Sequence, residues 1–185
     1  TVAGYSSVVS AETSMTVLVT GANRGIGLEL VRQMRARGHQ VIGTARKPEQ
    51  AMELKETGAR VVQLDVTDSN SIRAMAEQLK GQRIDLLINN AGMLGHNAQS
   101  FAETDFDQVI ATFDVNSLGP MRVTQALLPN ILAGSGKTVI QISSTMGSIA
   151  NNSGGYYGYR ASKAALNMLN SSLALELADN GITSV

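Results

Sequence analysis

Short apolar runs alternate along this chain with longer stretches in which apolar residues recur at helical spacing. The runs are rich in aliphatic and β-branched residues, as strands are, and Gly38, Gly58 and Gly181 each end a helical stretch. We expect Ser69 to cap one helix and a break near Gly119-Pro120 in another. The pattern predicts strands at 16–20, 41–44, 60–64, 84–88, 138–143 and 182–185, and helices at about 26–37, 49–57, 69–80, 103–128 and 157–178.

Strands that alternate with helices predict βαβ units, right-handed crossovers and a parallel sheet covered on both faces. The fold class is therefore α/β, a Rossmann-type doubly wound sheet that stops in or after its sixth strand. We expect one domain over 15–185. Residues 1–14 carry a single charge, Glu12, and lack the basic and apolar segments of a secretory signal. We interpret them as a disordered leader or extension.

Composition excludes several function classes. The chain has 185 residues, 43% apolar and 16% charged, which is typical of a globular protein. Its 15 basic and 15 acidic residues balance, so no general attraction for nucleic acid is expected. No apolar run is long enough to span a membrane, and we expect a cytoplasmic protein. Cysteine is absent and the two histidines, His39 and His96, are far apart, so no metal site is expected.

A glycine-rich turn joins the first predicted strand to the first helix. It reads Thr20-Gly-Ala-Asn-Arg-Gly-Ile-Gly27, and in this position glycines let the backbone approach a pyrophosphate at a helix N-terminus. A tight turn without a ligand is the alternative. The residues predicted here to bind a dinucleotide are Gly21, Asn23, Arg24, Gly25, Ile26 and Gly27.

Basic residues follow the second strand, where an NAD-binding fold normally carries an acid for the ribose hydroxyls. Arg46, together with Arg24, could instead hold a 2′-phosphate. This favours NADP(H), with NAD(H) kept as the alternative. An ordinary solvated role for Arg46 and Lys47 stays open. Asp65, after the third strand, is either an adenine contact or a turn or helix-cap residue.

Tyr159 and Lys163 lie four residues apart at the start of the last predicted helix, so they share one face. An ammonium group near a phenol stabilises the phenolate, and such a tyrosine can exchange a proton with an alcohol or a developing alkoxide. The spacing alone is equally typical of a surface pair. Its context is more specific, because Ser143 and Ser144 end the fifth strand and Asn116 lies inside a long helix.

The chain resembles the classical short-chain dehydrogenase/reductase family. The matching segments are TGANRGIG, LDVTD, NNAG, the Asn in FDVNSLGP, the ISS strand end and YRASKAAL, from about 16 to 185. The long separation of the serines from the tyrosine is most similar to the carbonyl-reductase-like branch that includes the C-factor and sniffer proteins.

The resemblance implies a role for each matching residue. Tyr159 would be the general acid/base, Lys163 would stabilise its phenolate and bind the nicotinamide ribose, and Ser144, rather than Ser143, would orient the carbonyl. Asn116 would hold a water that relays protons to Lys163. Tyr156 and Tyr157 either face the substrate or pack in the core or an interface. The cofactor cleft would also include Asp65, Val66, Asn90, Ala91 and Gly92.

Family members continue beyond the sixth strand with a Pro-Gly loop and a segment that covers the substrate, which this sequence lacks. The implied function is NADP(H)-dependent hydride transfer between nicotinamide and a small-molecule carbonyl or alcohol, in a homodimer or homotetramer. The alternatives are a non-catalytic NADP-binding regulator and an inactive fragment.

Overall fold

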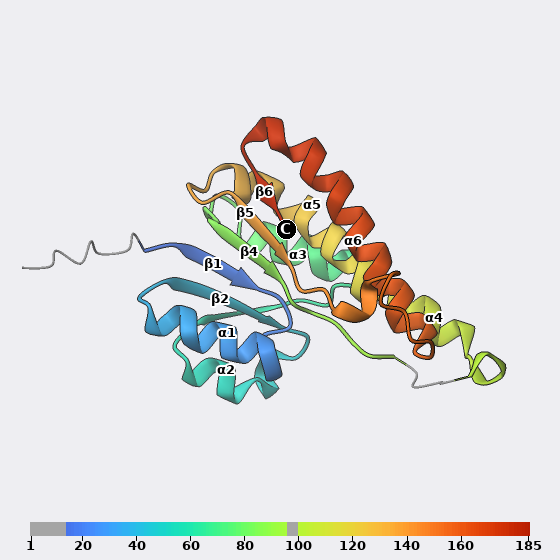
Figure 1. Ribbon diagram of the computed structural model, residues 1–185. Coiled ribbons are helices and arrows are strands. Elements are labelled where there is room, and N and C mark those ends of the chain that lie inside the picture. Colours follow the sequence, from blue (N-terminus) through green and yellow to red (C-terminus); the bar gives the residue numbers. More distant parts are fainter. Residues whose placement is uncertain (1–13, 96–99) are drawn as a thin grey trace, which may run out of the picture.

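Six parallel strands form one sheet, as the alternation of strands and helices predicts (Figure 1). Their order in the sheet is β3-β2-β1-β4-β5-β6. The computed structural model describes residues 14–95 and 100–185. The extension predicted at 1–14 therefore lies outside the described residues, except for Ser14. The strands are β1 (Thr16–Val19), β2 (Gln40–Ala45), β3 (Arg60–Gln63), β4 (Leu86–Asn89), β5 (Thr138–Gln141) and β6 (Thr183–Ser184).

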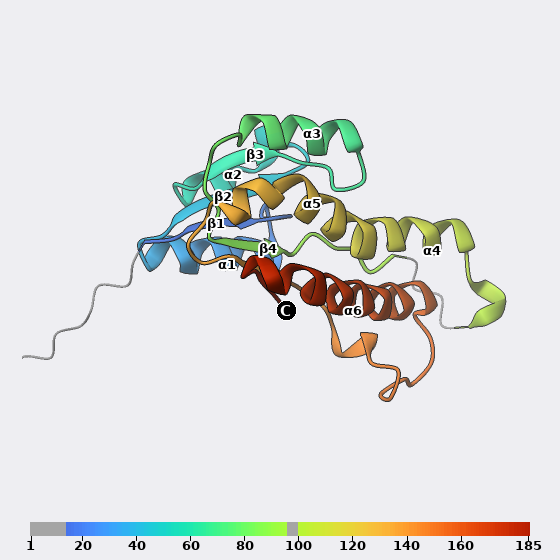
Figure 2. The same ribbon diagram turned by 90° about the horizontal axis from the view of Figure 1, so that it is seen from above.

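Helices cover both faces of the sheet, which confirms the doubly wound fold (Figures 1 and 2). Helices α1 and α2 pack on one face, and α3, α5 and the C-terminal end of α6 pack on the other. Helix α4 and the first half of α6 run side by side beyond the edge of the sheet (Figure 2). The helices are α1 (Gly25–Ala36), α2 (Met52–Glu56), α3 (Ser69–Gln78), α4 (Phe106–Phe113), α5 (Gly119–Leu132) and α6 (Tyr157–Leu177).

The central strands are apolar on both faces because both faces are buried. In β1, Val17 and Val19 face α1, Leu18 faces the opposite core, and all three are fully buried. In β4, Leu87 and Ile88 divide between the two cores in the same way. No helix within the described residues is both long and apolar enough to cross a membrane.

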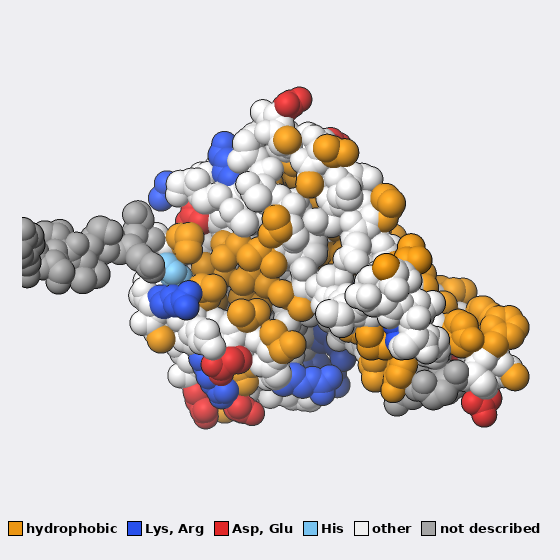
Figure 3. Space-filling model, in the orientation of Figure 1, with side chains coloured by type: hydrophobic (Ala, Val, Ile, Leu, Met, Phe, Trp, Pro, Cys, Tyr) orange, Lys and Arg blue, Asp and Glu red, His pale blue; other side chains and the backbone are white. Residues whose placement is uncertain are grey.

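The sheet is less well covered over β5. Val139 faces the helices of the α5 side and is fully buried, whereas Ile140 and Ile142 face the α1 side and are partly exposed. An apolar patch over the strands is visible on this side of the molecule (Figure 3). Helices α1 and α2 lie over β1 to β3 and leave this part of the face open (Figure 1).

Two details of the helices differ from the prediction. The irregularity expected at Gly119-Pro120 lies earlier, in a π-helical turn over Asp114–Leu118 that joins α4 to α5. Pro120 is tolerated because it lies in the first turn of α5, where its missing N–H costs little. The cap of α3 is Asp68 and not Ser69, since the Asp68 carboxylate accepts a hydrogen bond from the backbone N–H of Asn70.

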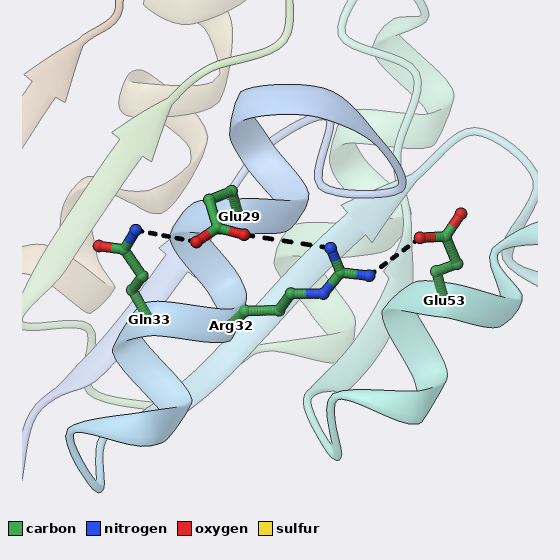
Figure 4. A network of polar contacts seen from close by, with 4 residues as sticks. All are labelled: Glu29, Arg32, Gln33 and Glu53. Atoms are coloured by element: carbon green, nitrogen blue, oxygen red, sulfur yellow. Dashed lines mark hydrogen bonds and ion pairs between the residues drawn. The ribbon is translucent and has the colours of Figure 1, made fainter.

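A polar network on the surface joins α1 to α2 (Figure 4). The guanidinium of Arg32 donates to Glu53 at 2.9 Å and lies 4.0 Å from Glu29, which also accepts from Gln33. All of these side chains are largely exposed, so each pair adds at most about 1 kcal/mol. The network is thus a minor addition to the apolar core, which holds the two helices against the sheet.

A buried carboxylate ties β4 to its neighbours. Asp85, directly before β4, accepts hydrogen bonds from the backbone N–H of Thr16 and from the backbone and hydroxyl of Ser135. The backbone N–H of Gly136 is a fourth donor. Burial by itself raises the pKa of Asp85, but these hydrogen bonds more than offset it and lower the pKa from 3.8 to about 2. The ionised carboxylate therefore stabilises the folded chain.

We predict that Asp85→Asn lowers the free energy of unfolding at pH 7 by about 2 kcal/mol, because an amide nitrogen would face backbone donors. The wild-type contribution is present above pH 4 and is lost as the pH falls from 3.8 toward 2. Urea unfolding at pH 7 and at low pH measures both effects. Asp107→Asn on the exposed surface is the control, and an equal loss in both variants would contradict the assignment.

Candidate active site

The carboxyl ends of the central strands open into one cleft of about 480 Å³. Ligands bind at this position in open α/β sheets, where the strand order reverses between β1 and β4. The cleft runs from the glycine-rich turn after β1 to the start of α6. It is lined by Gly21, Asn23, Arg24, Gly25, Ile26, Ala45, Arg46, Leu64, Asp65, Val66, Thr67, Asn90, Ala91, Gly92, Met93, Leu94, Val115, Ile142, Ser143, Tyr159 and Lys163.

Glycines are required in the turn after β1 for two different reasons. Gly21 has a φ of +62°, and a Cβ there would lie 2.9 Å from the Cα of Ala91. Gly27 is buried in α1 behind the turn, where a Cβ would collide with the amide of Asn90 and the carbonyl of Gly21. Gly27 therefore does not line the cleft. The absence of a side chain at Gly27 lets α1 pack closely against the sheet, so that the N-terminus of α1 points into the cleft.

Hydrogen bonds fasten this turn to the loop after β4. The buried hydroxyl of Thr20 accepts from the backbone N–H groups of Asn90 and Ala91, both at 3.0 Å. The side-chain amide of Asn90 donates in return to the carbonyls of Thr20 and Gly21. The two halves of the cleft are thus held in one fixed relation.

Basic side chains gather at the outer end of the cleft. Arg24 and Arg46 line both this cleft and an adjoining one of about 660 Å³. Lys47, Asp65 and Asp68 also line the adjoining cleft. The three cations outnumber the two carboxylates, so an anion is favoured there.

The Asp65 carboxylate stabilises the turn that follows β3. It accepts from the backbone N–H of Thr67 at 3.0 Å and from its hydroxyl at 2.7 Å. Burial by itself raises the pKa of Asp65, but the two bonds from Thr67 and the charge of Arg46 lower it below the ordinary value. The structure thus supports the turn interpretation of this residue, which also lines the cleft.

Lys163 and Tyr159 form the inner end of the cleft. The Nζ of Lys163 lies 5.9 Å from the centroid of the Tyr159 ring and donates to the carbonyl of Ile142 at 2.6 Å. Lys163 is 5% exposed, and burial lowers its pKa. The two side chains therefore lie together, as expected for residues four apart on one face of a helix.

Asn116 lies behind this pair, in the π-helical turn, and is fully buried. Its side-chain carbonyl accepts from the backbone N–H of Met93 at 2.8 Å, and its amide nitrogen donates to the carbonyl of Met93 at 2.8 Å. The same nitrogen donates to the hydroxyl of Ser162 at 3.1 Å. The polar side chain has its hydrogen bonds satisfied, which explains how asparagine is tolerated inside a helical segment.

The two serines after β5 differ in how they use their hydroxyl groups. Ser143 lines the cleft and donates its proton to the side-chain carbonyl of Asn167 at 2.6 Å. Ser144 lies outside the lining and accepts from the backbone N–H of Met146 at 3.1 Å. A hydroxyl has one proton to donate, so Ser144 keeps its proton for another acceptor whereas the proton of Ser143 is committed.

The residues directly before α6 are held in an unusual conformation. Tyr156 has a φ of 47° and occupies the left-handed region at the N-terminus of the helix, which is costly for a bulky residue. The ring of Tyr157 packs edge-on against Phe101, at 6.1 Å between centroids, and is 42% exposed. Tyr157 therefore lies on the surface beside Phe101 and does not line the cleft.

Every residue predicted to bind the cofactor except Gly27 lines this one cleft, as do Tyr159 and Lys163, whereas Asn116 and Ser144, the other two predicted catalytic residues, are not part of its lining. Sequence reasoning missed several lining residues. Ile142 could have been found, since it lies at the end of the strand predicted at 138–143, and Ser143, considered above as the alternative to Ser144, also lines the cleft. The other missed residues are Ala45, Leu64, Thr67, Met93, Leu94 and Val115.

Comparison with known proteins agrees with this geometry. The sequence matches the model of the short chain dehydrogenase family over residues 15–185. The chain belongs to the short-chain dehydrogenase family. The resemblance inferred from the motifs is thereby confirmed, as is the Rossmann-type sheet.

Relatives within this family include carbonyl reductases. The chain is 36% identical to the NADPH-bound carbonyl reductase from chicken fatty liver, with a TM-score of 0.85, covering 92% of this chain and 74% of that one. The carbonyl reductase Sniffer of D. melanogaster is 28% identical with a TM-score of 0.85, over 93% of this chain and 79% of that one. The C-signal of Myxococcus xanthus is 42% identical over 115 residues, which are 62% of this chain and 69% of the relative.

Proposed function

We propose that this short-chain dehydrogenase is an NADP(H)-dependent oxidoreductase that transfers hydride between the nicotinamide and a small-molecule carbonyl or alcohol. The observation that carries the proposal is the continuity of one cleft. It begins at a glycine-rich turn and a helix N-terminus and ends at Tyr159 and Lys163. The chicken relative, with its bound NADPH, is a carbonyl reductase.

The residues of the cleft fit a dinucleotide. The turn after β1 offers backbone N–H groups at the N-terminus of α1 to a pyrophosphate. At the other end, a Cβ on Gly92 would lie 3.3 Å from Asn116 and 3.9 Å from the Nζ of Lys163. Glycine there leaves space beside the lysine for a ribose. When bound, the nicotinamide supplies or accepts the hydride.

Tyr159 would exchange the proton with the substrate oxygen. Lys163 would place a positive charge beside the phenol ring during that transfer, with its Nζ 5.9 Å from the ring centroid. Its ammonium group would also donate to the nicotinamide ribose. The bond to the carbonyl of Ile142 fixes the position of this ammonium group.

Ser144 would donate to the substrate carbonyl and polarise it. The hydrogen bonds favour this serine over Ser143, because the proton of Ser143 already goes to Asn167. Asn116 would hold the relay water through its backbone, since its side chain is engaged by Met93 and Ser162.

A 2′-phosphate would bind between Arg46 and Arg24, at the junction of the two clefts. Arg46 directly follows β2, where a carboxylate would select the unphosphorylated ribose. Guanidinium groups suit a phosphate because they can donate two hydrogen bonds in parallel. NADP(H) is therefore the proposed cofactor, and NAD(H) the weaker alternative.

A second candidate is a non-catalytic NADP-binding regulator, which the similarity to the relative named C-signal favours. Cofactor binding is common to both candidates. Turnover of an aldehyde, ketone or quinone separates them.

Homodimerisation or tetramerisation is proposed through α4 and α6. Both helices carry large exposed apolar side chains, with Ile110 66%, Met168 68% and Leu175 79% exposed. Phe101 and Phe106 extend this surface at the start of α4. A second copy of the chain would bury these side chains symmetrically.

We predict that Tyr159→Phe lowers kcat at least about 10²-fold, because it removes the acid/base group, and leaves the binding of NADPH within about twofold. Steady-state rates with a carbonyl panel and a cofactor titration measure the two effects. The control is Tyr157→Phe, which removes a phenol hydroxyl group from a tyrosine two residues earlier in the chain. Near-normal turnover in Tyr159→Phe would refute the assigned role.

We predict that Arg46→Asp weakens the binding of NADPH by about 1.5–3 kcal/mol relative to the binding of NADH. The substitution replaces a cation that would pair with the 2′-phosphate by a carboxylate that would accept hydrogen bonds from the ribose hydroxyls. Isothermal titration with both cofactors measures the ratio. Arg83→Asp, an equal charge change on an exposed residue outside both clefts, is the control. An unchanged ratio in Arg46→Asp would remove the basis for the 2′-phosphate site.

The oligomer is tested by sedimentation of the Met168→Glu/Leu175→Glu variant. We expect the wild type to sediment as a dimer or tetramer and the variant as a monomer, because a carboxylate is costly in an apolar interface. Met52→Glu, which alters an exposed apolar residue on α2, away from this surface, is the control and should leave the oligomer intact. A monomeric wild type at micromolar concentration would rule the interface out.

A further inference from the structure

A buried hydroxyl group that belongs to none of the assigned roles joins the elements behind the cleft. Ser162, in the second turn of α6 between Tyr159 and Lys163, is 0% exposed. Its hydroxyl donates to the backbone carbonyl of Tyr159 at 2.8 Å and accepts from the side-chain nitrogen of Asn116 at 3.1 Å. Both functions of this hydroxyl are thereby used.

The bond to Ser162 completes the hydrogen bonding of Asn116. The two other bonds of that amide go to the backbone of Met93, in the loop after β4. A chain of hydrogen bonds therefore runs from the cleft wall at Met93, through Asn116 and Ser162, to the backbone of Tyr159. Rotating the Asn116 amide by half a turn would place its nitrogen against the N–H of Met93, so its orientation is fixed.

A parallel bond reinforces the same junction without entering this chain. The hydroxyl of Ser117, which is also buried, donates to the backbone carbonyl of Ser162 at 2.8 Å. Both bonds connect the π-helical turn to α6. Both cross-links reach α6 at Ser162, but only the Ser162 hydroxyl also donates to the backbone carbonyl of Tyr159, one turn earlier in the same helix.

We propose that Ser162 is a positioning residue, whose hydroxyl fixes Tyr159 and Lys163 against the loop at Gly92 and Met93. A helix that can shift by a fraction of a turn would change the distance between the phenol and the cofactor side of the cleft. Misplacement by about 1 Å can cost up to about 10²-fold in rate. The proposal rests on the proposed hydride-transfer function for its kinetic consequence, but the linkage itself does not.

Two matched alanine variants test the kinetic part. We expect Ser162→Ala to lower kcat by about tenfold or more, with the KM for NADPH within about twofold of wild type. Ser117→Ala removes an equally buried hydroxyl from the same junction and leaves the chain from Met93 to Tyr159 intact, so kcat should change much less. Equal losses of kcat in the two variants, or normal kcat in Ser162→Ala, would overturn the proposal.

A thermal double-mutant cycle of Ser162→Ala and Asn116→Ala tests the linkage without turnover. Because the two residues share a hydrogen bond, we expect the combined loss in Tm to be smaller than the sum of the single losses. Additive losses would overturn the linkage. If the wild type binds NADPH but reduces no carbonyl, the proposed function fails while this cycle still decides whether Ser162 connects Asn116 to α6.

Discussion

The site depends on the cross-link between the turns that follow β1 and β4. These two strands are neighbours in the sheet, and their connections leave on opposite sides, which opens the cleft. The hydroxyl of Thr20 and the amide of Asn90 exchange four hydrogen bonds with the two turns. Glycine at Gly21 permits the close approach that these bonds need. The glycine-rich turn at one end of the cleft and the loop at Asn90–Gly92, which leads toward Tyr159 and Lys163, are thus cross-linked to each other.

Polar groups behind that wall are buried at little net cost because they bond to one another. Asn116, Ser162 and Ser117 are each 0–1% exposed and hydrogen-bonded. Lys163 differs, since burial disfavours its charged form and lowers its pKa. Burying this ammonium group costs free energy of folding, and side chains whose pKa is shifted by burial are common where side chains carry chemistry.

The order of the elements and the members of the site follow from the sequence because they depend on local patterns. Strand and helix periodicity locates each element, and the rule that ligands gather at strand carboxyl ends brings Gly21, Asp65 and Asn90 to one edge of the sheet. The position of the π-helical turn does not follow, since it is set by the contacts of Asn116 with Met93 and Ser162. The role of Gly27 likewise cannot be predicted from the sequence. A glycine here indicates that another group approaches its backbone closely, but the packing of α1 decides whether that group is a ligand or Asn90.

The most direct test of the account is the thermal unfolding of the chain alone and with saturating NADPH or NADH. A cofactor that binds the folded state raises the Tm by mass action. We expect one cooperative transition, raised by NADPH by roughly 5–10 °C at about 100 times its Kd and less by NADH at equal concentration. A transition that neither cofactor shifts, or that NADH shifts more than NADPH, would contradict the account.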